Sequence, residues 1–388
     1  MKTAVVLAGG KGTRLRPLTY TVPKPLVPVC NVPLLDMILK LIFRSGFKRV
    51  IVVVKYLGDQ IRKHLEEVND ELGIDLIVPN VDPLDTADAV RKCRNYIDGD
   101  FLVTMGDVLT NMDLDSFAKF HERRGGIASV ALKAVENPLE YGVVLLGHDE
   151  RIELFMEKPR SIELYVVGLA YSKVRPRMFY ANLVNTGFYA LSYEILDILN
   201  DNPYLMDWGR HVFPYLLENG YDVYGWNVGD AYWRDIGRLQ SYLQANFDLM
   251  EGLVPPFKPP GFHSRGVWVA GDADIERATI LPPVVIGDGV VAEEGAVIGP
   301  YAVLGNGVLV ASNAQVIESV VWDDSFVGPG ARVEESVLAR SVVVGEGARV
   351  LRHSAVGEGA QVPRRAELNG ESVSPSRVAH TLKAVVKR

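Results

Sequence analysis

The sequence is poor in the residues that build covalent crosslinks and metal clusters. Its 388 residues include only two cysteines, Cys30 and Cys93, and seven histidines. Two cysteines exclude a disulfide-rich scaffold and a cysteine-based metal cluster. The fold must therefore rest on a hydrophobic core, and a hydrophobic content of 48% is ample for one.

Long apolar runs and an excess of positive charge are also missing. The longest apolar helical stretch, Leu34 to Phe43, is interrupted by Asp36 and Lys40, so we expect no membrane-spanning helix. A net charge of -7 argues against a nucleic-acid partner but leaves room for local sites that bind phosphorylated small molecules. The chain opens with a strand pattern rather than a signal sequence, so we expect a cytoplasmic protein with no membrane partner.

The first part of the chain alternates apolar strands with amphipathic helices. This alternation predicts a mostly parallel, Rossmann-like sheet with helices on both faces. Ligands of such sheets bind beyond the carboxyl ends of the strands. The expected strands are residues 3–7, 49–54, 74–78 and 100–105, and the expected helices are residues 34–42, 59–71 and 86–96.

A glycine-rich loop with fixed positive charge follows the first strand. It reads Leu7-Ala8-Gly9-Gly10-Lys11-Gly12-Thr13-Arg14, and Lys24 follows between Pro23 and Pro25. Glycines let backbone N–H groups converge on an anion, while arginine and lysine supply complementary cations for phosphate. The loop is neither a Walker P-loop nor a dinucleotide fingerprint, because Leu15 stands at the third glycine position of the latter.

Two aspartates are candidates for holding a divalent cation. Asp107 follows an expected strand in Gly106-Asp107, and Asp235 lies in Trp233-Arg234-Asp235-Ile236-Gly237. Two carboxylates that meet near bound phosphates attract a hard cation such as Mg²⁺. Taken alone, an aspartate after a strand is more often a turn former or a helix cap.

A repeat of six residues takes over after the proline-rich stretch Pro255–Gly261. Its aliphatic positions include Ile286, Ala292, Ile298, Leu304, Val310 and Val316, and its frame shifts after Val316 and again after Ala339. This hexapeptide pattern predicts a parallel β-helix. We therefore expect an α/β domain over residues 1–250, a linker over 251–265 and a β-helix domain with a tail over 266–388.

The run from Gly9 to Pro25 resembles the signature of the sugar-1-phosphate nucleotidyltransferases, G-G-x-G-T-R-L-x-P-L-T followed by P-K-P. Further segments resemble motifs of the same family, in the family's order. They are Gly106-Asp107, Tyr141-Gly142-Val143-Val144, Glu157-Lys158-Pro159, Asn185-Thr186-Gly187-Phe188-Tyr189 and the Trp233–Gly237 segment. The repeat, which resembles left-handed β-helices, and Leu368-Asn369-Gly370 are most similar to GDP-mannose pyrophosphorylases.

This resemblance implies the reaction of an NTP with a sugar 1-phosphate to give an NDP-sugar and pyrophosphate, with Mg²⁺ as cofactor. It also implies three groups of site residues. The catalytic group is Arg14, Lys24, Asp107 and Asp235, of which the two aspartates hold the metal. The nucleotide-binding group is Leu7, Ala8, Gly9, Gly10, Gly12, Thr13, Asp85, Thr86 and Gly106. The sugar-phosphate-binding group is Gly142, Glu157, Lys158 and Asn185.

The substrate pair is less constrained than the reaction. GTP with mannose 1-phosphate is the expected pair, and glucose 1-phosphate with dTTP, UTP or ATP is the alternative. Asp85 stands where the family commonly has a glycine close to the base, so it either accepts from a guanine N–H or only caps the next helix. The stretch from Ser161 to Tyr180 is longer than usual for the family.

Two other functions remain open at this point. A non-catalytic regulatory or scaffold homologue would have lost the Gly-Thr-Arg run, the lysine or the aspartates, and none is lost here. A β-helix that transfers acyl groups would use a histidine base, for which His353 is the candidate inside the repeat. We expect His353 to be an exposed turn residue and the β-helix to serve homo-oligomerisation.

Overall fold

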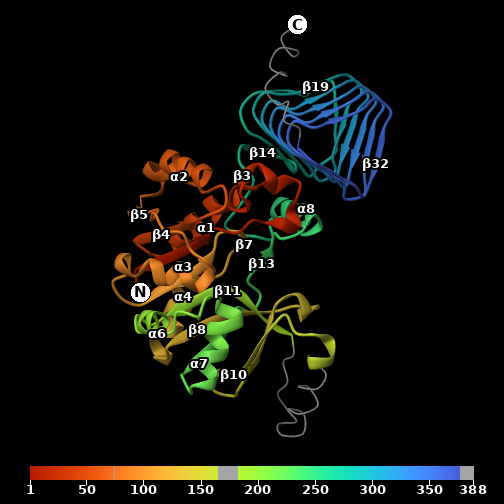
Figure 1. Ribbon diagram of the computed structural model, residues 1–388. Helices are drawn as coiled ribbons and strands as arrows, with labels where there is room; N and C mark the ends of the chain where they lie inside the picture. The colour runs from red at the N-terminus through yellow and green to blue at the C-terminus, as the bar shows by residue number, and fades with distance from the viewer. Residues whose placement is uncertain (74, 165–181, 376–388) are drawn as a thin grey trace. The chain divides into compact units, whose positions relative to one another are not determined.

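The computed structural model describes residues 1–73, 75–164 and 182–375, which form two compact units (Figure 1). The first unit comprises Met1–Gly10, Ile38–Gly106 and Met112–Trp233. The second comprises Lys11–Met37, Asp107–Asn111 and Arg234–Arg388. The long segment after Pro159 falls mostly on residues 165–181, outside the described residues.

The first unit is built on a nine-stranded sheet. The strand order is β10-β9-β11-β6-β1-β4-β5, and β8 pairs with both β11 and β12. The strands are β1 (Thr3–Ala8), β4 (Arg49–Val54), β5 (Asp75–Ile77), β6 (Phe101–Met105), β8 (Ala128–Ala134), β9 (Gly142–Leu146), β10 (Ile152–Glu157), β11 (Leu183–Leu191) and β12 (Val223–Asn227).

The parallel part of this sheet confirms the predicted fold class. β1 is buried along its whole length and pairs in parallel with β4 and β6, as expected of an apolar strand covered on both faces. Beyond β6 the sheet is antiparallel, because β11 pairs antiparallel with β6, β8 and β9. The sequence analysis did not predict this antiparallel part.

The three predicted helices lie close to their expected positions. The predicted helix over residues 86–96 is instead α3 (Thr86–Lys92) followed by a 3₁₀ turn at Arg94–Tyr96. None of the helices in the described residues is long and apolar enough to cross a membrane. The other helices are α2 (Gly58–Leu72), α4 (Leu114–Arg124), α6 (Ile195–Asp201) and α7 (Phe213–Glu218), and α1 (Leu34–Arg44) begins in the second unit.

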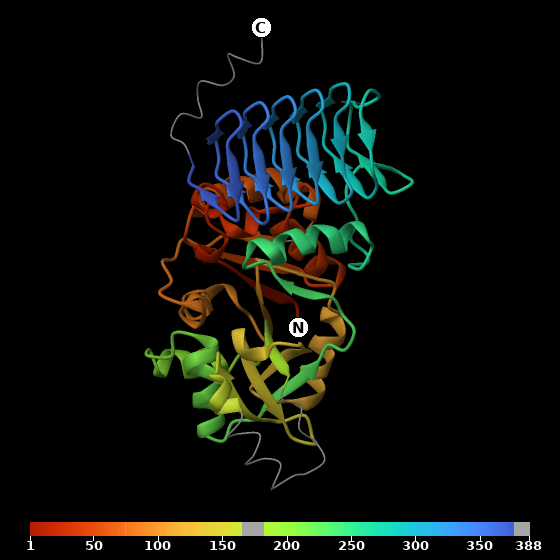
Figure 2. The same cartoon turned by 90° about the vertical axis from the view of Figure 1, so that its right-hand side faces the viewer.

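A parallel β-helix dominates the second unit and confirms the prediction from the hexapeptide repeat (Figure 2). Its strands form three parallel faces, each coil adding one strand to each face. The first face is a hairpin strand β14 (Phe262–Ser264) and then β15 (Val267–Val269), β18 (Val284–Ile286), β21 (Ala302–Leu304), β24 (Val320–Val321), β27 (Val337–Leu338), β30 (Ala355–Val356) and β33 (Ser372–Val373). The second is β16 (Ala273–Asp274), β19 (Val290–Ala292), β22 (Leu309–Val310), β25 (Phe326–Val327), β28 (Val343–Val344) and β31 (Gln361–Val362). The third is β17 (Thr279–Ile280), β20 (Val297–Ile298), β23 (Gln315–Ile317), β26 (Arg332–Glu334), β29 (Arg349–Leu351) and β32 (Glu367–Asn369).

The strand register locates the two shifts in the repeat. Ile286 pairs with Leu304 eighteen residues on, but Leu304 pairs with Val321 and Val321 with Leu338, each seventeen residues on. The second shift therefore lies before Leu338 and not after Ala339 as predicted. Both side chains are apolar and fully buried, so the pattern alone did not distinguish them.

A short hairpin and a helix complete the second unit. The hairpin strands β2 (Pro28–Val29) and β3 (Val32–Pro33) flank Cys30 and Asn31, which both have positive φ angles. The Asn31 amide donates to Leu304 O on the β-helix at 2.8 Å. Tyr242 on α8 (Leu239–Met250) donates to Pro28 O at 2.6 Å and accepts from Trp322 Nε1 at 2.9 Å. The hairpin, α8 and the β-helix are thus joined by hydrogen bonds.

A buried histidine in the first unit makes its stability depend on pH. His121 on α4 is 2% exposed, and its Nδ1 lies 2.9 Å from Ser129 Oγ. Burial lowers the pKa of His121 below the usual 6.5, against the charges of Asp100 and Glu122, which favour protonation. His121 is therefore neutral in the folded protein at neutral pH.

We expect the first unit to lose stability as the pH falls below about 6.5, since the unfolded chain then binds a proton at His121 that the folded chain resists. Denaturant unfolding at about pH 7.5 and about pH 5.5 measures this change. His121→Gln, which does not titrate, should show a smaller drop in midpoint over the same interval. An equal drop in both proteins would show that His121 is not the cause of the pH-dependent loss of stability.

Candidate functional site

The second unit brings all four predicted catalytic residues into one cluster of charges. Lys24 Nζ lies 2.7 Å from Asp107 Oδ2 and 2.9 Å from Asp235 Oδ1. Arg14 Nη2 lies 3.1 Å from Asp235 Oδ2, so the two cations contact opposite oxygens of one carboxylate. Lys24 is 6% exposed, whereas half of the Arg14 side chain reaches solvent. We call these four residues the charge cluster.

The ionisation of the charge cluster follows from its pairing. Burial alone would lower the pKa of Lys24, but Asp107 and Asp235 outweigh it and raise that pKa above its usual value. Burial would likewise raise the pKa of Asp235, but Lys24 and Arg14 hold it below its usual range. The lysine and Asp235 are therefore both charged at neutral pH.

Local backbone geometry fixes Lys24. It opens the 3₁₀ turn Lys24–Leu26 between Pro23 and Pro25, whose rings restrict the chain on both sides. Gly12 has φ +56°, and a Cβ there would lie 3.0 Å from Thr19 Cγ2 and 3.1 Å from Lys24 Cβ. Thr19 Oγ1 donates to Gly12 O at 2.7 Å. The glycine is thus needed both for its φ angle and for close packing against Lys24.

Gly237 has a role that the sequence analysis missed. A Cβ at this position would lie 2.7 Å from Arg14 Nη2 and 2.9 Å from Asp235 Oδ2. The absence of a side chain leaves room for the ion pair between them. The sequence signal for this role is the position of Gly237, two residues after Asp235 in the Trp233–Gly237 motif.

The strand ends of the first unit carry the expected nucleotide-binding residues. Leu7 and Ala8 end β1 and are buried, and Gly9 and Gly10 follow. Gly106 N donates to Leu7 O at 2.9 Å, so the ends of neighbouring strands β1 and β6 lie together. Gly12 and Thr13 belong to the second unit, where Thr13 opens a 3₁₀ turn at Thr13–Leu15.

Asp85 and Thr86 begin α3. Asp85 is its N-cap, and Asp85 Oδ1 accepts from Thr86 N at 2.8 Å, which supports the capping role considered for it. The Thr86 hydroxyl donates to Asp207 Oδ2 at 3.1 Å and accepts from Trp208 N at 3.2 Å. The segment around Asp207 is therefore joined to the start of α3.

A buried carboxylate that the sequence analysis missed holds the loop before Asp85. Asp88 is fully buried, and its Oδ2 accepts from Leu84 N at 2.7 Å and lies 2.9 Å from Lys92 Nζ. Burial would raise the pKa of Asp88, but the Leu84 amide, Lys92 and Arg91 together lower it. The sequence signal for this role is that Asp88 lies between two alanines on the buried side of the helix.

Glu157 and Lys158 lie together at the end of β10. Lys158 has φ +48°, its N donates to Tyr141 O, and its Nζ lies 3.3 Å from Glu157 Oε1. A Cβ added to Gly142 would lie 2.9 Å from Glu157 Oε2, and a Cβ added to Gly209 would lie 2.6 Å from the same oxygen. The structure thus brings three predicted residues together with Gly209.

Asn185 uses its amide within its own strand. Its Nδ2 donates to Tyr189 OH at 3.0 Å, and its Oδ1 accepts from Gly187 N at 2.9 Å. These bonds span an irregularity in β11, where the register with β8 shifts between Asn185 and Tyr189. The side chain therefore stabilises the bulge in addition to any role toward a sugar.

The chemistry of the charge cluster suits a hard divalent cation. Asp107 and Asp235 direct oxygens at one position, which the Lys24 ammonium fills in this structure. Among the described residues no group of three or more His, Cys, Asp or Glu side chains gathers at a possible metal site. Two carboxylates suffice for Mg²⁺, which keeps waters and phosphate oxygens as its other ligands.

Comparison with known proteins places the chain in a family. A family model described as nucleotidyl transferase matches residues 3–252, and one described as GMPPB C-terminal domain matches residues 273–384. A UTP–glucose-1-phosphate uridylyltransferase of Synechocystis sp. is 30% identical over 85% of this chain and 85% of its own. A mannose-1-phosphate guanylyltransferase catalytic subunit beta of Danio rerio is 31% identical over 62% of each chain. A probable mannose-1-phosphate guanylyltransferase 1 of Oryza sativa is 29% identical over 85% of this chain and 88% of its own.

The charge cluster predicts a non-additive pair of substitutions. Lys24→Met should lower the free energy of unfolding by about 1–3 kcal/mol, because it leaves two facing carboxylates without their shared cation. Lys24→Met combined with Asp107→Asn should recover part of that loss, since one of the repelling charges is removed. Denaturant unfolding at neutral pH measures both. A double variant less stable than Lys24→Met alone would show that the carboxylates do not repel.

Proposed function

The chain is an enzyme of the nucleotidyl transferase family, and we propose that it joins GTP and mannose 1-phosphate to give GDP-mannose and pyrophosphate. The observation that carries this proposal is the intact charge cluster, in which two cations and two carboxylates are held together. A non-catalytic scaffold has no need of a buried lysine shared by two aspartates. We propose that the enzyme is a homo-oligomer formed through its β-helix.

In the proposed reaction, an oxygen of the sugar phosphate attacks the α-phosphorus of the NTP in line. The bond between that phosphorus and the bridging oxygen of pyrophosphate breaks, and pyrophosphate leaves with the electron pair. Such transfers depend on positioning and on charge stabilisation rather than on a protein nucleophile. Lys24 neutralises charge on the α-phosphate, while Gly12, Thr13 and Arg14 bind the β- and γ-phosphates and stabilise the leaving group.

Asp107 and Asp235 would hold Mg²⁺, which supplies a concentrated positive charge for the oxygens of the transferring phosphate. The first unit supplies the remaining groups in this proposal. Leu7, Ala8, Gly9 and Gly10, with Asp85, Thr86 and Gly106, bind the base and ribose. Lys158 binds the phosphate of the incoming sugar, and Gly142, Glu157 and Asn185 contact the sugar. The exposure of about half of the Lys158 side chain supports this role, because the ammonium is accessible to a ligand.

The choice of GTP over UTP rests on Asp85. Its Oδ1 caps α3, and a carboxylate has a second oxygen that can accept a hydrogen bond. Guanine presents two adjacent donors, N1–H and N2–H, whereas uracil places its single N–H between two carbonyl oxygens that repel a carboxylate. The capping role and the base-reading role are therefore compatible.

The named relatives support different substrate pairs. Guanylyltransferases named for mannose 1-phosphate favour the proposed pair, and the uridylyltransferase named for glucose 1-phosphate favours UTP with glucose 1-phosphate.

The β-helix offers little for acyl transfer. His353 lies exposed at a bend with φ +62°, as the sequence analysis expected.

A substrate panel tests the proposal. GTP, dTTP, UTP, ATP and CTP are each combined with mannose 1-phosphate and glucose 1-phosphate, and pyrophosphate release is measured with and without Mg²⁺. We expect the highest kcat/KM for GTP with mannose 1-phosphate, and only when Mg²⁺ is present. A preference for UTP with glucose 1-phosphate would replace the proposed pair, and no turnover with any pair would favour a scaffold.

Gly237 offers a mild perturbation of the charge cluster. Gly237→Ala should lower kcat by about tenfold, because its methyl group displaces the Arg14 guanidinium, whereas Arg14→Ala should cost about 10²–10³. Gly252→Ala is the matched control in the same unit: Gly252 has φ +75° and no neighbour within 4 Å of an added Cβ. Gly252→Ala should lose stability and keep kcat, whereas Gly237→Ala should lose kcat and keep its stability. Equal kcat in the two glycine variants would exclude the role given to Gly237.

A further inference from the structure

Helix α8 contacts the segments on both sides of the charge cluster. Asp248, near the end of this helix, pairs with Arg234, the residue directly before Asp235. The roles assigned above use neither Arg234 nor Asp248. We propose that Asp248 is a positioning residue, which through Arg234 fixes the Asp235 carboxylate opposite Lys24 and so sets how well the charge cluster accepts a divalent cation. The role toward the cation rests on the proposed function.

The pairing of Arg234 with Asp248 is close and oriented. Arg234 Nε lies 3.1 Å and Nη2 lies 2.9 Å from Asp248 Oδ2, and the second oxygen, Oδ1, accepts from Gln244 Nε2 at 2.8 Å. Asp248 is only 4% exposed. A buried carboxylate is stable only when its oxygens have partners, so α8 fixes the place of Asp248 and the guanidinium has to meet it there.

The strand β13 (Trp233–Asp235) transmits this anchor to Asp235. Successive side chains of a strand point to opposite faces, so Arg234 and Asp235 leave the backbone on opposite sides. Asp235 meets Lys24 and Arg14 on one side, and Arg234 meets α8 on the other. A strand held on both faces cannot rotate freely, and rotation is the motion that would carry the Asp235 carboxylate away from Lys24.

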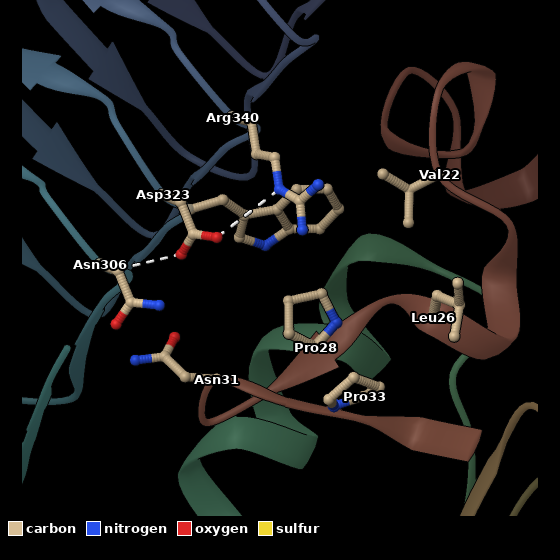
Figure 3. Close-up of a pocket in the computed structure, with 9 residues that line it drawn as sticks. Val22, Leu26, Pro28, Asn31, Pro33, Asn306, Asp323 and Arg340 are labelled. Atoms are coloured by element: carbon tan, nitrogen blue, oxygen red, sulfur yellow. Dashed lines mark hydrogen bonds and ion pairs between the residues drawn. The ribbon is translucent and has the colours of Figure 1, made fainter. Parts of the chain in front are cut away.

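The same helix holds the segment that carries Lys24. Tyr242 OH donates to Pro28 O at 2.6 Å, and Asn246 Oδ1, which is fully buried, accepts from Cys30 N at 2.7 Å. Asn246 Nδ2 donates to Tyr242 O at 2.8 Å, which fixes the orientation of the amide. Figure 3 shows Pro28 on this segment beside the green ribbon of α8. One helix therefore anchors both the lysine side and the aspartate side of the ion pair.

This anchor matters most when the cations of the charge cluster bind substrate. In the proposed reaction Lys24 and Arg14 turn to phosphate oxygens, which weakens their hold on Asp235. The pair of Arg234 and Asp248 involves neither of these cations, so it keeps the Asp235 carboxylate in place for a divalent cation. Residues that orient metal-binding side chains in this way typically contribute about 10–100-fold in metal affinity or activity.

An unfolding experiment in the absence of divalent cations tests the positioning. Lys24→Met leaves two carboxylates facing each other, and it costs most when Asp235 cannot move away. We therefore expect Asp248→Asn combined with Lys24→Met to raise the unfolding equilibrium constant about fivefold less than the product of their separate effects. Tyr301→Phe is the matched control, because it removes the hydrogen bond from Tyr301 OH to Glu251 Oε1 at the end of the same helix. Its effect should multiply with that of Lys24→Met.

A kinetic experiment tests the role toward the cation. With the substrate pair that the panel selects, Asp248→Asn should raise the Mg²⁺ concentration for half-maximal rate by about tenfold. The KM for the sugar phosphate should stay within about twofold, since the proposed sugar-phosphate-binding group lies in the first unit. Arg234→Gln should have the same effect, and Arg234→Gln combined with Asp248→Asn should be no worse than either alone. Tyr301→Phe should leave both constants unchanged.

Every other outcome overturns part of the proposal. Effects of Asp248→Asn and Lys24→Met that simply multiply would show that Asp248 stabilises α8 without positioning Asp235. Coupled unfolding with an unchanged Mg²⁺ requirement would overturn the role toward the cation, and a double variant worse than both single ones would show that Arg234 and Asp248 act independently. The unfolding experiment needs no turnover. An enzyme that is inactive with every substrate pair would therefore refute the proposed function, while the unfolding data would still decide the positioning role.

Discussion

The sharing of one buried ammonium between two carboxylates is the interaction on which the functional part of the second unit depends. Burying Lys24 without a partner would cost several kcal/mol, and two facing carboxylates without a cation would repel each other. Each charge is therefore tolerated only because the others are present. Since the three residues lie far apart in the sequence, the fold must bring their segments together for any of them to be stable.

The surrounding residues of the second unit serve this arrangement. Pro23 and Pro25 restrict the chain at Lys24, and Gly12 lets the backbone approach the lysine stem. Farther along, Tyr242 ties Pro28 to the β-helix through Trp322. The β-helix is thus part of the support for the segment that carries Lys24.

Short linear motifs predicted which charged residues gather into one cluster, because residues in one motif report a local requirement. Arg14, Lys24, Asp107 and Asp235 were chosen from separate motifs, and the structure brings them together. The parallel strands and the β-helix were predictable for a similar reason, since both have a strong local period. The antiparallel strands, in contrast, depend on pairing between distant segments, which no local pattern encodes.

Other features could not be predicted from the sequence, for reasons specific to each residue. Gly237 matters for the side chain it lacks, and its effect becomes visible only when Arg14 is placed beside it. Asp88 looks like an ordinary helical aspartate until the burial of that face is known. The glycine-rich loop reads as one continuous motif, yet Gly9 and Gly10 belong to the first unit and Gly12 to the second.

The segment from Val22 to Pro28 carries Lys24 and also lies beside the β-helix. Its lysine belongs to the charge cluster, while Val22, Leu26 and Pro28 face a pocket beside the β-helix. Pro23, Pro25 and Pro28 fix three of its φ angles, so the segment has few ways to bend. A displacement at Leu26 is therefore not easily absorbed before it reaches Lys24. The same stiffness holds the Lys24 side chain in its place in the charge cluster.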